Sequence, residues 1–180
     1  MNCDASAATD VDVKRRDDTL PAQAGAVMLR SISTVDRRLE YCLSLARENM
    51  LPYLLRRGQD FDDTRWRNLA PRASFYLIAD ATTAAQTTLG FLSVRGEPDC
   101  PNALHVGDIQ LEAQHRNRGI GWATLQHVEY MARSRGQNEL TLNVFRDNPA
   151  MRLYERFGFR RIDMQFDKYK MRKALPRAQQ

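Results

Sequence analysis

Two glycines, one residue apart, follow two arginines in the middle of the chain. Arg116, Arg118, Gly119 and Gly121 stand between an alternating apolar run that ends at Leu111 and a long segment with helical spacing. The first N–H groups of a helix have no internal partner, and the helix dipole adds partial positive charge at the same end. Such a turn can bind a phosphate, because glycines let it approach the backbone and arginines add charge.

Other turns share parts of this pattern. A dinucleotide-binding turn requires a third glycine where the chain has Thr124, and a nucleotide P-loop requires Gly-Lys-Ser/Thr, which is absent. An ordinary strand-to-helix turn requires nothing further. The two glycines alone therefore leave an ordinary turn open.

A second segment, 142–159, adds a tyrosine with catalytic potential. Asn148 can cap a helix whose first residue is Pro149, and apolar residues then follow at helical spacing until Gly158. Tyr154 falls on the apolar stripe of this helix, which by itself predicts a tyrosine of the core.

Together the two segments resemble the GNAT superfamily of acyl-CoA-dependent N-acetyltransferases, over roughly residues 26–174. The family's pyrophosphate loop reads Arg/Gln-x-x-Gly-x-Gly/Ala and is matched by Arg116, Gly119 and Gly121. Its later helix reads Asn-x-x-Ala-x-x-Leu-Tyr-x-x-x-Gly-Phe and is matched by Asn148, Leu153, Tyr154, Gly158 and Phe159, with Ala150 one residue early. Trp122 departs from the family, which usually has a small or polar residue there, and we expect it to pack on the protein.

The resemblance implies acetyl transfer from acetyl-CoA to an amine by direct attack in one ternary complex. It places Tyr154 near the thioester sulfur, between strands four and five, and a backbone N–H near Leu111 at the oxyanion. The residues expected to contact acetyl-CoA are Ile109, Leu111, Arg116, Asn117, Arg118, Gly119, Ile120, Gly121, Trp122, Ala123, Asn143, Asn148, Ala150 and Arg156.

The general base is left open by the sequence. Freeing the lone pair of a lysine-like amine, with a pKa of ~10.4, costs about 4–5 kcal/mol at pH 7, so a base or a water chain is needed. Asn143 stands where some members carry a glutamate, and it cannot act as a base. His105, Asp108 and Glu48 are the candidates.

The connection from Glu48 to Trp66 suggests the charge of the acceptor. It mixes acids (Asp60, Asp62, Asp63) with aromatic residues on an otherwise basic chain. Such a mixture attracts ammonium groups, which predicts a cationic small-molecule amine as the acceptor. Capping of the following helix is the alternative role of the three aspartates.

The predicted elements form one α/β domain. Strands are expected over 26–31, 74–80, 87–95, 104–111 and 140–144, with a C-terminal hairpin over 159–174 turning near Phe166 and Asp167. Helices are expected from about residue 36, interrupted at Pro52, and over 64–69, 119–135 and 149–157. The fold expected is a twisted, mostly antiparallel sheet of about seven strands, with strands four and five parallel and splayed, flanked by about four helices. Residues 1–24 and 176–180 are expected to be tails around a domain at 25–175.

Composition limits the other possibilities. The 180-residue chain carries a net charge of +5 and three separated cysteines, and its histidines lack metal-ligand spacing. It contains no apolar run of ~20 residues, so we expect no membrane span. The separated cysteines favour reduced thiols in a cytoplasmic protein over a disulfide, and the histidine spacing predicts no metal. Nucleic acid is not expected as a partner, because basic and aromatic residues do not interleave. A homodimer, a non-catalytic acyl-CoA-binding or sensing module, and a protein N-terminal or lysine acetyltransferase remain open.

Overall fold

The computed structural model describes residues 27–97 and 100–176 of the chain. The strands are β1 (Val27–Ile32), β2 (Ser74–Asp80), β3 (Thr88–Glu97), β4 (Cys100–Leu111), β5 (Glu139–Phe145), β6 (Arg160–Gln165) and β7 (Lys168–Ala174). The α-helices are α1 (Arg38–Leu55), α2 (Asp63–Leu69), α3 (Ile120–Ser134) and α4 (Met151–Phe157), and two short 3₁₀ turns are η1 (Ala70–Arg72) and η2 (Ala113–His115). The predicted tail at 1–24, and all but the first residue of 176–180, lie outside the described residues.

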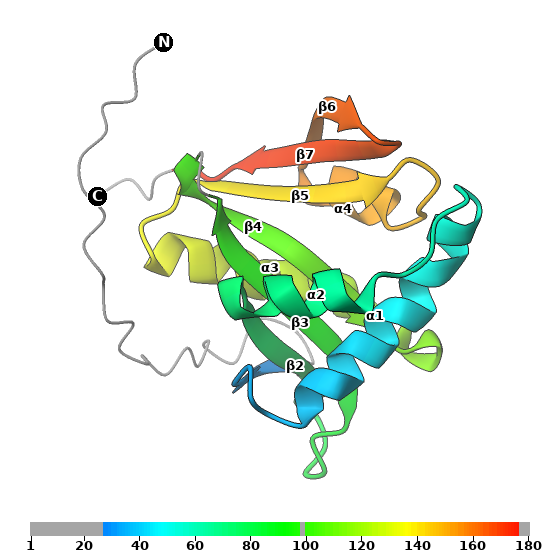
Figure 1. Ribbon diagram of the computed structural model, residues 1–180. Coiled ribbons are helices and arrows are strands. Elements are labelled where there is room, and N and C mark those ends of the chain that lie inside the picture. Colours follow the sequence, from blue (N-terminus) through cyan, green and yellow to red (C-terminus); the bar gives the residue numbers. More distant parts are fainter. Residues whose placement is uncertain (1–26, 98–99, 177–180) are drawn as a thin grey trace.

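One mixed sheet organises these elements, with strand order β1-β2-β3-β4-β5-β7-β6. Each neighbouring pair is antiparallel except β4 and β5, which are parallel. The parallel pairing runs only from Ala103 opposite Glu139 to Val106 opposite Leu142, and beyond it the strands separate. Figure 1 shows β4 and β5 diverging toward α1. The predicted fold, including the splayed parallel pair, is confirmed.

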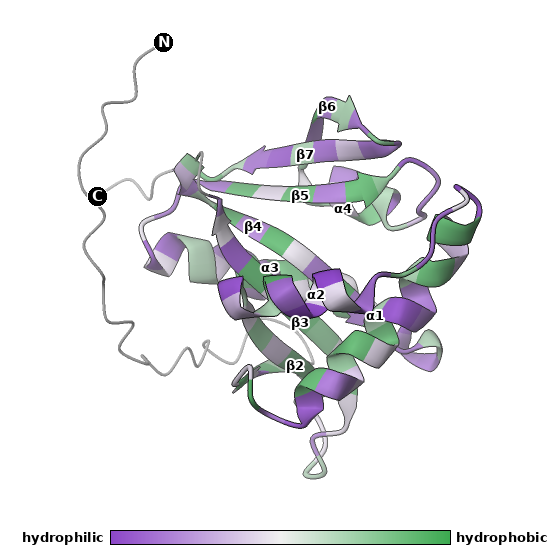
Figure 2. Cartoon of the chain, in the orientation of Figure 1, coloured by the Kyte–Doolittle hydropathy of each residue, from purple (hydrophilic) through white to green (hydrophobic). Residues whose placement is uncertain are grey.

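Helices cover both faces of the sheet, and each face has its own apolar cluster. On one face α3 and α4 pack against β1 to β5 and β7 around Leu92, Leu104 and Leu142. On the other face α1 and the segment after α2 pack on β1 to β3 around Phe75 and Phe91. Figure 1 shows α1 and α2 in front of the sheet and α3 behind it, and Figure 2 shows that the central strands are mostly apolar whereas β7 is hydrophilic.

The first helix is longer than the sequence predicts, because α1 continues through Pro52 to Leu55. A proline inside a helix removes one hydrogen bond and costs ~3 kcal/mol or more. Tertiary contacts hold the last turn in place. The ring of Tyr53 stacks on Phe145 at 6.0 Å, and Arg57 donates to the Tyr53 carbonyl at 2.7 Å and pairs with Asp147.

The C-terminal turns lie where the sequence predicts them. The β6–β7 hairpin turns at Phe166 and Asp167, whose φ angles are 49° and 63°. Gly158 ends α4 with a φ of 101°, in the left-handed region that glycine adopts without a steric penalty. Asn148 accepts the N–H of Ala150 at 2.9 Å, although α4 itself begins only at Met151.

Candidate functional site

The site begins where β4 and β5 separate, at a bulge in β4. Ser93 pairs with Asp108 while Val94 pairs with Val106, so Gly107 is the extra residue of β4. A Cβ at Gly107 would lie 2.6 Å from the Ser93 hydroxyl oxygen, which explains the glycine. The bulge keeps the Asp108 side chain on the face of the sheet that carries α1 and α2.

Asp108 is held by a chain of hydrogen bonds. The Ser93 hydroxyl donates to its Oδ2 at 2.8 Å, and Gln110 Nε2 donates to its Oδ1 at 3.2 Å. Asn49 of α1 donates from Nδ2 to Gln110 Oε1 at 3.0 Å and accepts from Arg116 Nη2 at 2.5 Å. Through Asn49 and Gln110, the carboxylate is thus connected to the arginine that begins the predicted phosphate loop.

Tyr154 lies on α4 and packs against the main apolar cluster. It is partly buried, and its ring meets Phe159 edge-on at a centroid distance of 5.9 Å. Burial first, and then the negative charge of Asp108, raise the pKa of Tyr154 to about 12. The hydroxyl therefore stays protonated at neutral pH and can donate a hydrogen bond to a leaving thiolate.

His105 belongs to a buried network rather than to the opening. Its side chain is 3% exposed, and Nδ1 lies 2.9 Å from Thr141 Oγ1, which donates to Glu97 at 2.7 Å. Burial first, then the positive charges of Arg95 and Lys170, lower the pKa of His105 to about 4, against the opposing effect of Glu97. A neutral imidazole with so low a pKa is a weak proton acceptor at pH 7.

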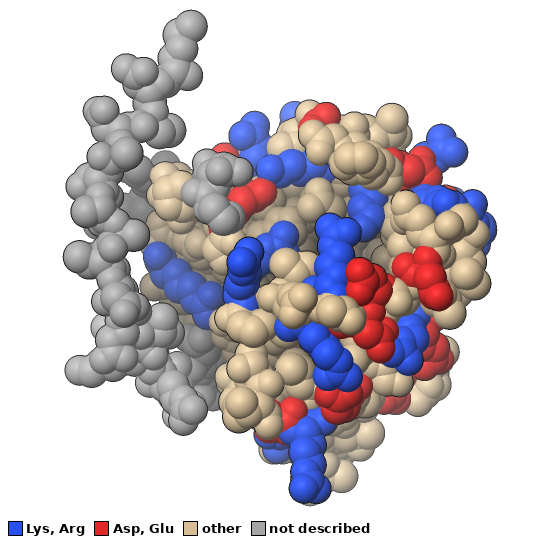
Figure 3. All heavy atoms as spheres, viewed as in Figure 1, with Lys and Arg blue, Asp and Glu red and all other residues tan. Residues whose placement is uncertain are grey.

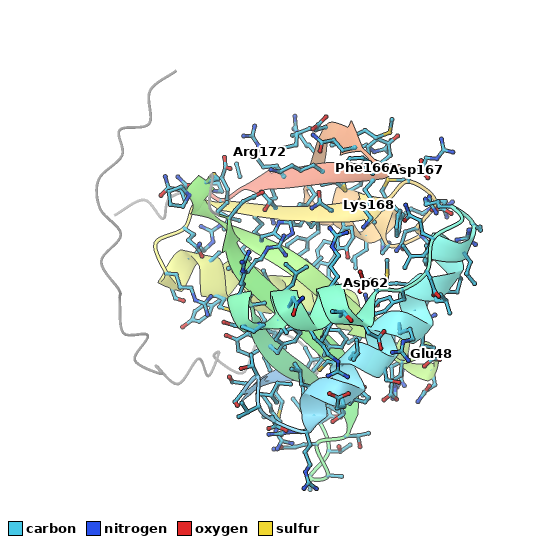
Figure 4. All side chains as sticks on the ribbon, viewed as in Figure 1. Glu48, Asp62, Phe166, Asp167, Lys168 and Arg172 are labelled. Carbon is cyan, nitrogen blue, oxygen red and sulfur yellow. The ribbon has the colours of Figure 1, made fainter. Side chains whose placement is uncertain are left out.

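Glu48 lies elsewhere on α1 and is exposed. It lines a hollow of about 250 Å³ between α1 and η2, together with Tyr41, Ser44, Leu45, Glu112, Ala113 and Gln114. Figure 4 shows Glu48 on α1, well apart from Lys168 at the start of β7. The charge of Asp108 thus acts on Tyr154, whereas His105 and Glu48 lie in two other environments.

The predicted phosphate loop has the geometry that anion binding requires. Gly119 is the N-cap of α3 with a φ of 79°, and a Cβ there would meet nothing within 4 Å. Among the described residues, no group accepts the backbone N–H groups of residues 117–122. Arg116 and Arg118 are exposed on this loop. These residues fit a pyrophosphate, whose oxygens the free N–H groups and guanidinium groups can bind.

Two residues of the loop, Gly121 and Trp122, contribute to packing between α3 and α4. A Cβ at Gly121 would lie 2.8 Å from Leu153 Cδ2, so this glycine allows α3 to pack closely on α4. Trp122 is 40% exposed and meets Phe157 edge-on at 5.0 Å, in agreement with the predicted packing on the protein.

The other residues expected at acetyl-CoA are distributed over β4, the phosphate loop, α3, β5 and α4. Ile109, Leu111 and Ile120 are partly buried against the main cluster, and Ala123 is buried in it. Asn143 is exposed on β5, just beyond the last residue that pairs with β4. Asn117 and Arg156 are exposed, on the loop and on α4 respectively.

Ser93, Gln110 and Asn49 were not predicted as site residues. Their types are common, and the bonds to Asp108 and Gln110 span up to 61 positions of sequence. An alternating strand with a glycine and an aspartate in its middle was the one available signal of the bulge.

Comparison with known proteins gives the family. The model of the Acetyltransferase (GNAT) family matches residues 41–159, more than half of the chain. The chain belongs to the GNAT acetyltransferases. GNAT enzymes use an acyl-CoA, so acetyl-CoA is the cosubstrate that family membership assigns to the chain.

Relatives and solved structures agree with this assignment. The chain is 40% identical over 57 residues to streptothricin acetyltransferase of Streptomyces lavendulae, covering 31% of the chain and 30% of the relative. It is 33% identical over 82 residues to the uncharacterized N-acetyltransferase YycN of Bacillus subtilis, covering 44% and 53%. It thus spans about half or less of these relatives. A PaiA N-acetyltransferase of Thermoplasma acidophilum, solved with coenzyme A, shares the fold with a TM-score of 0.62 at 20% identity, over 83% of this chain and 99% of that one.

Other kinds of site find no support in the part of the chain that the structure describes. No group of three or more His, Cys, Asp or Glu side chains there could hold a metal ion. Cys42 and Cys100 are both free thiols. None of the helices at 27–97 or 100–176 is long and apolar enough to cross a membrane.

Proposed function

We propose that this GNAT protein transfers an acetyl group from acetyl-CoA to a primary amine of a small molecule, by direct attack in a ternary complex. The observation that carries the proposal is the position of Asp108 and Tyr154 at the splay of β4 and β5, with the free N–H groups of the phosphate loop at the start of α3. A carboxylate for the amine and a protonated hydroxyl for the sulfur are the two groups that this reaction needs.

The reaction assigns a separate role to each group. The acceptor nitrogen attacks the acetyl carbonyl carbon, the carbon–sulfur bond breaks, and the thiolate takes up a proton. Tyr154 hydrogen-bonds the sulfur first and gives its proton as negative charge develops there. Asp108 attracts the acceptor ammonium and receives the proton that the nitrogen loses. A backbone N–H near Leu111 as oxyanion donor stays a prediction.

Among the three candidate bases, the contacts favour Asp108. Its charge acts on Tyr154, whereas His105 is buried against Thr141 and Glu48 lines the hollow beside η2. We therefore infer that His105 and Glu48 are not the base.

The acids that suggested a cationic acceptor have structural partners. Asp62 is the N-cap of α2 and its side chain accepts the backbone N–H of Arg65 at 2.8 Å, and Asp63 pairs with Arg47. Asp60 accepts the N–H of Phe61 at 2.7 Å. The capping role therefore explains much of this cluster, and Asp108 becomes the acid we propose for attracting the cationic amine.

The experiment is a screen of primary amines with acetyl-CoA, measuring free thiol and the mass of the acetylated product. We expect thiol and product in equal amounts, released only when an amine is present. Binding of acetyl-CoA without product from any amine would instead indicate an acyl-CoA-binding or sensing module. Product from peptides alone would indicate a protein acetyltransferase.

A further inference from the structure

The β5–β7 wing, comprising β5, β7 and β6, presents a row of cations on the same face of the sheet as Asp108. Lys168, Lys170 and Arg172 of β7 pair with Phe145, Asn143 and Thr141 of β5, and Thr141 pairs with His105 of β4. Directly paired residues project from the same face, so the three cations lie beside the splay. Figure 3 shows Lys and Arg side chains gathered along the hollow between α2 and this wing.

Two of these three cations have carboxylate partners. Lys170 donates to Glu97 at 2.8 Å, and Arg172 lies 3.5 Å from Glu139. Lys168 differs, because none of the described residues forms an ion pair with it. Its ammonium lies 4.4 Å from the centre of the Phe145 ring, and the side chain is partly buried.

Arg65, in the first part of α2, also lacks an ion pair with any described residue. Burial first, and then the charges of Arg65 and Arg57, lower the pKa of Lys168, whereas Asp108 acts in the opposite direction. Arg57 is already paired with Asp147 and Asp167. Figure 4 shows Lys168 on the wing and Asp62 at the start of α2, on the neighbouring part of the molecule.

Lys168 is partly buried and Arg65 is exposed, and neither forms an ion pair with a described residue. An anion bound between two such cations reduces the repulsion of their like charges and gains charge-assisted hydrogen bonds. Asp108 and Lys168 project from the same face of the sheet, on either side of the splay, so a small molecule bound between Lys168 and the start of α2 can extend its amine toward Asp108.

We propose that Lys168 and Arg65 bind a carboxylate of the acceptor while Asp108 holds its amine, so that the substrate is a zwitterionic small molecule of the amino acid type. This inference rests on the proposed acetyl transfer and specifies its acceptor. The amine is cationic, as the sequence suggested, but the molecule also carries an anionic group.

The test compares amino acids with their own amides as acceptors, for example β-alanine with β-alaninamide and lysine with lysinamide. Each pair offers the same amine with and without the carboxylate. Amidation lowers the pKa of the amine and so raises the fraction of free amine, which would favour the amide. We expect the wild type to prefer the acid at least ten-fold in kcat/KM in at least one pair.

Variants of Lys168 and Arg65 test whether these two cations cause the preference for the acid over the amide. Lys168→Met removes the charge and keeps an apolar stem against Phe145. It should lower kcat/KM for the acid at least ten-fold, mainly through KM, and leave the amide nearly unchanged, while Lys168→Arg retains the preference. Arg65→Gln should act in the same direction, and Arg37→Gln, which removes an exposed charge at the start of α1, should change neither acceptor.

Results against the anion site can be told apart from results against the proposed acetyl transfer. Preference of the wild type for the amides, or equal losses for acid and amide in Lys168→Met, would overturn the anion site while leaving acetyl transfer intact. Absence of thiol release with every amine, despite binding of acetyl-CoA, would contradict the proposed function itself.

Discussion

Nη2 of Arg116 donates a hydrogen bond to Oδ1 of Asn49 across 2.5 Å, which joins the phosphate loop to the middle of α1. Asn49 in turn donates a hydrogen bond to Gln110, and Gln110 donates one to Asp108. The side chain that we expect to meet the pyrophosphate and the side chain that we assign to the amine therefore belong to one hydrogen-bonded chain.

Removal of Asn49 should disturb both ends of this chain. Asn49→Ala leaves Gln110 and Arg116 without their shared partner, and each lost bond is worth about 0.5–1.5 kcal/mol. We expect kcat to fall about ten-fold and acetyl-CoA to bind a few-fold more weakly, measured by steady-state kinetics and calorimetry. Asn68→Ala on the exposed side of α2 is the matched control, and equal behaviour of the two variants would refute the coupling.

Substitutions at Gly119 separate backbone strain from loss of the phosphate site. Gly119→Ala and Gly119→Glu share the cost of a positive φ, roughly 1–2 kcal/mol, and in both the added Cβ meets no atom within 4 Å. Acetyl-CoA should still raise the Tm of Gly119→Ala, whereas the negative side chain of Gly119→Glu should abolish the increase. Equal increases in Tm for both variants would mean that the loop is an ordinary turn.

Tyr154→Phe should lower kcat roughly 10²-fold with little change in the affinity for acetyl-CoA, because the hydroxyl acts chiefly as the sulfur becomes anionic. Tyr130→Phe, on the exposed side of α3, serves as the control. Since the pKa of Tyr154 is raised to about 12, the fall in rate expected from its deprotonation lies above the range in which the enzyme can be assayed. A kcat close to that of the wild type would assign Tyr154 to packing alone.

His105 should make stability depend on pH in the acidic range. Its pKa is lowered to about 4 in the folded protein, from the ordinary histidine value of 6.5. The unfolded chain therefore takes up a proton first, and the free energy of unfolding should decrease as the pH falls from 6.5 to 4, by roughly 3 kcal/mol in total. His105→Gln should show a shallower decrease in urea unfolding at pH 7 and pH 5. An unchanged difference between the two pH values would contradict the buried neutral histidine.

Local signals were sufficient for much of the fold and for several residues of the candidate site. The phosphate loop, Tyr154 and the turn at Phe166 are specified within a few residues of sequence, so patterns could place them. Pro52 was misread because contacts of Tyr53 with a distant strand outweigh the local preference. Asn49 and Lys168 could not be found as site residues, since their roles depend on how α1 and β7 lie against β4.

The most direct measurement compares Asp108→Asn with His105→Gln, using the best amine from the screen and measuring thiol release and acetylated product. The amide of Asp108→Asn keeps the shape and loses the charge that holds the amine. We expect Asp108→Asn to lower kcat/KM for the amine at least 10²-fold while acetyl-CoA still stabilises it, and His105→Gln to stay within a few-fold of the wild type. Full activity of Asp108→Asn, or a severe loss in a folded His105→Gln, would contradict the assignment of Asp108 as the acid–base group of this GNAT site.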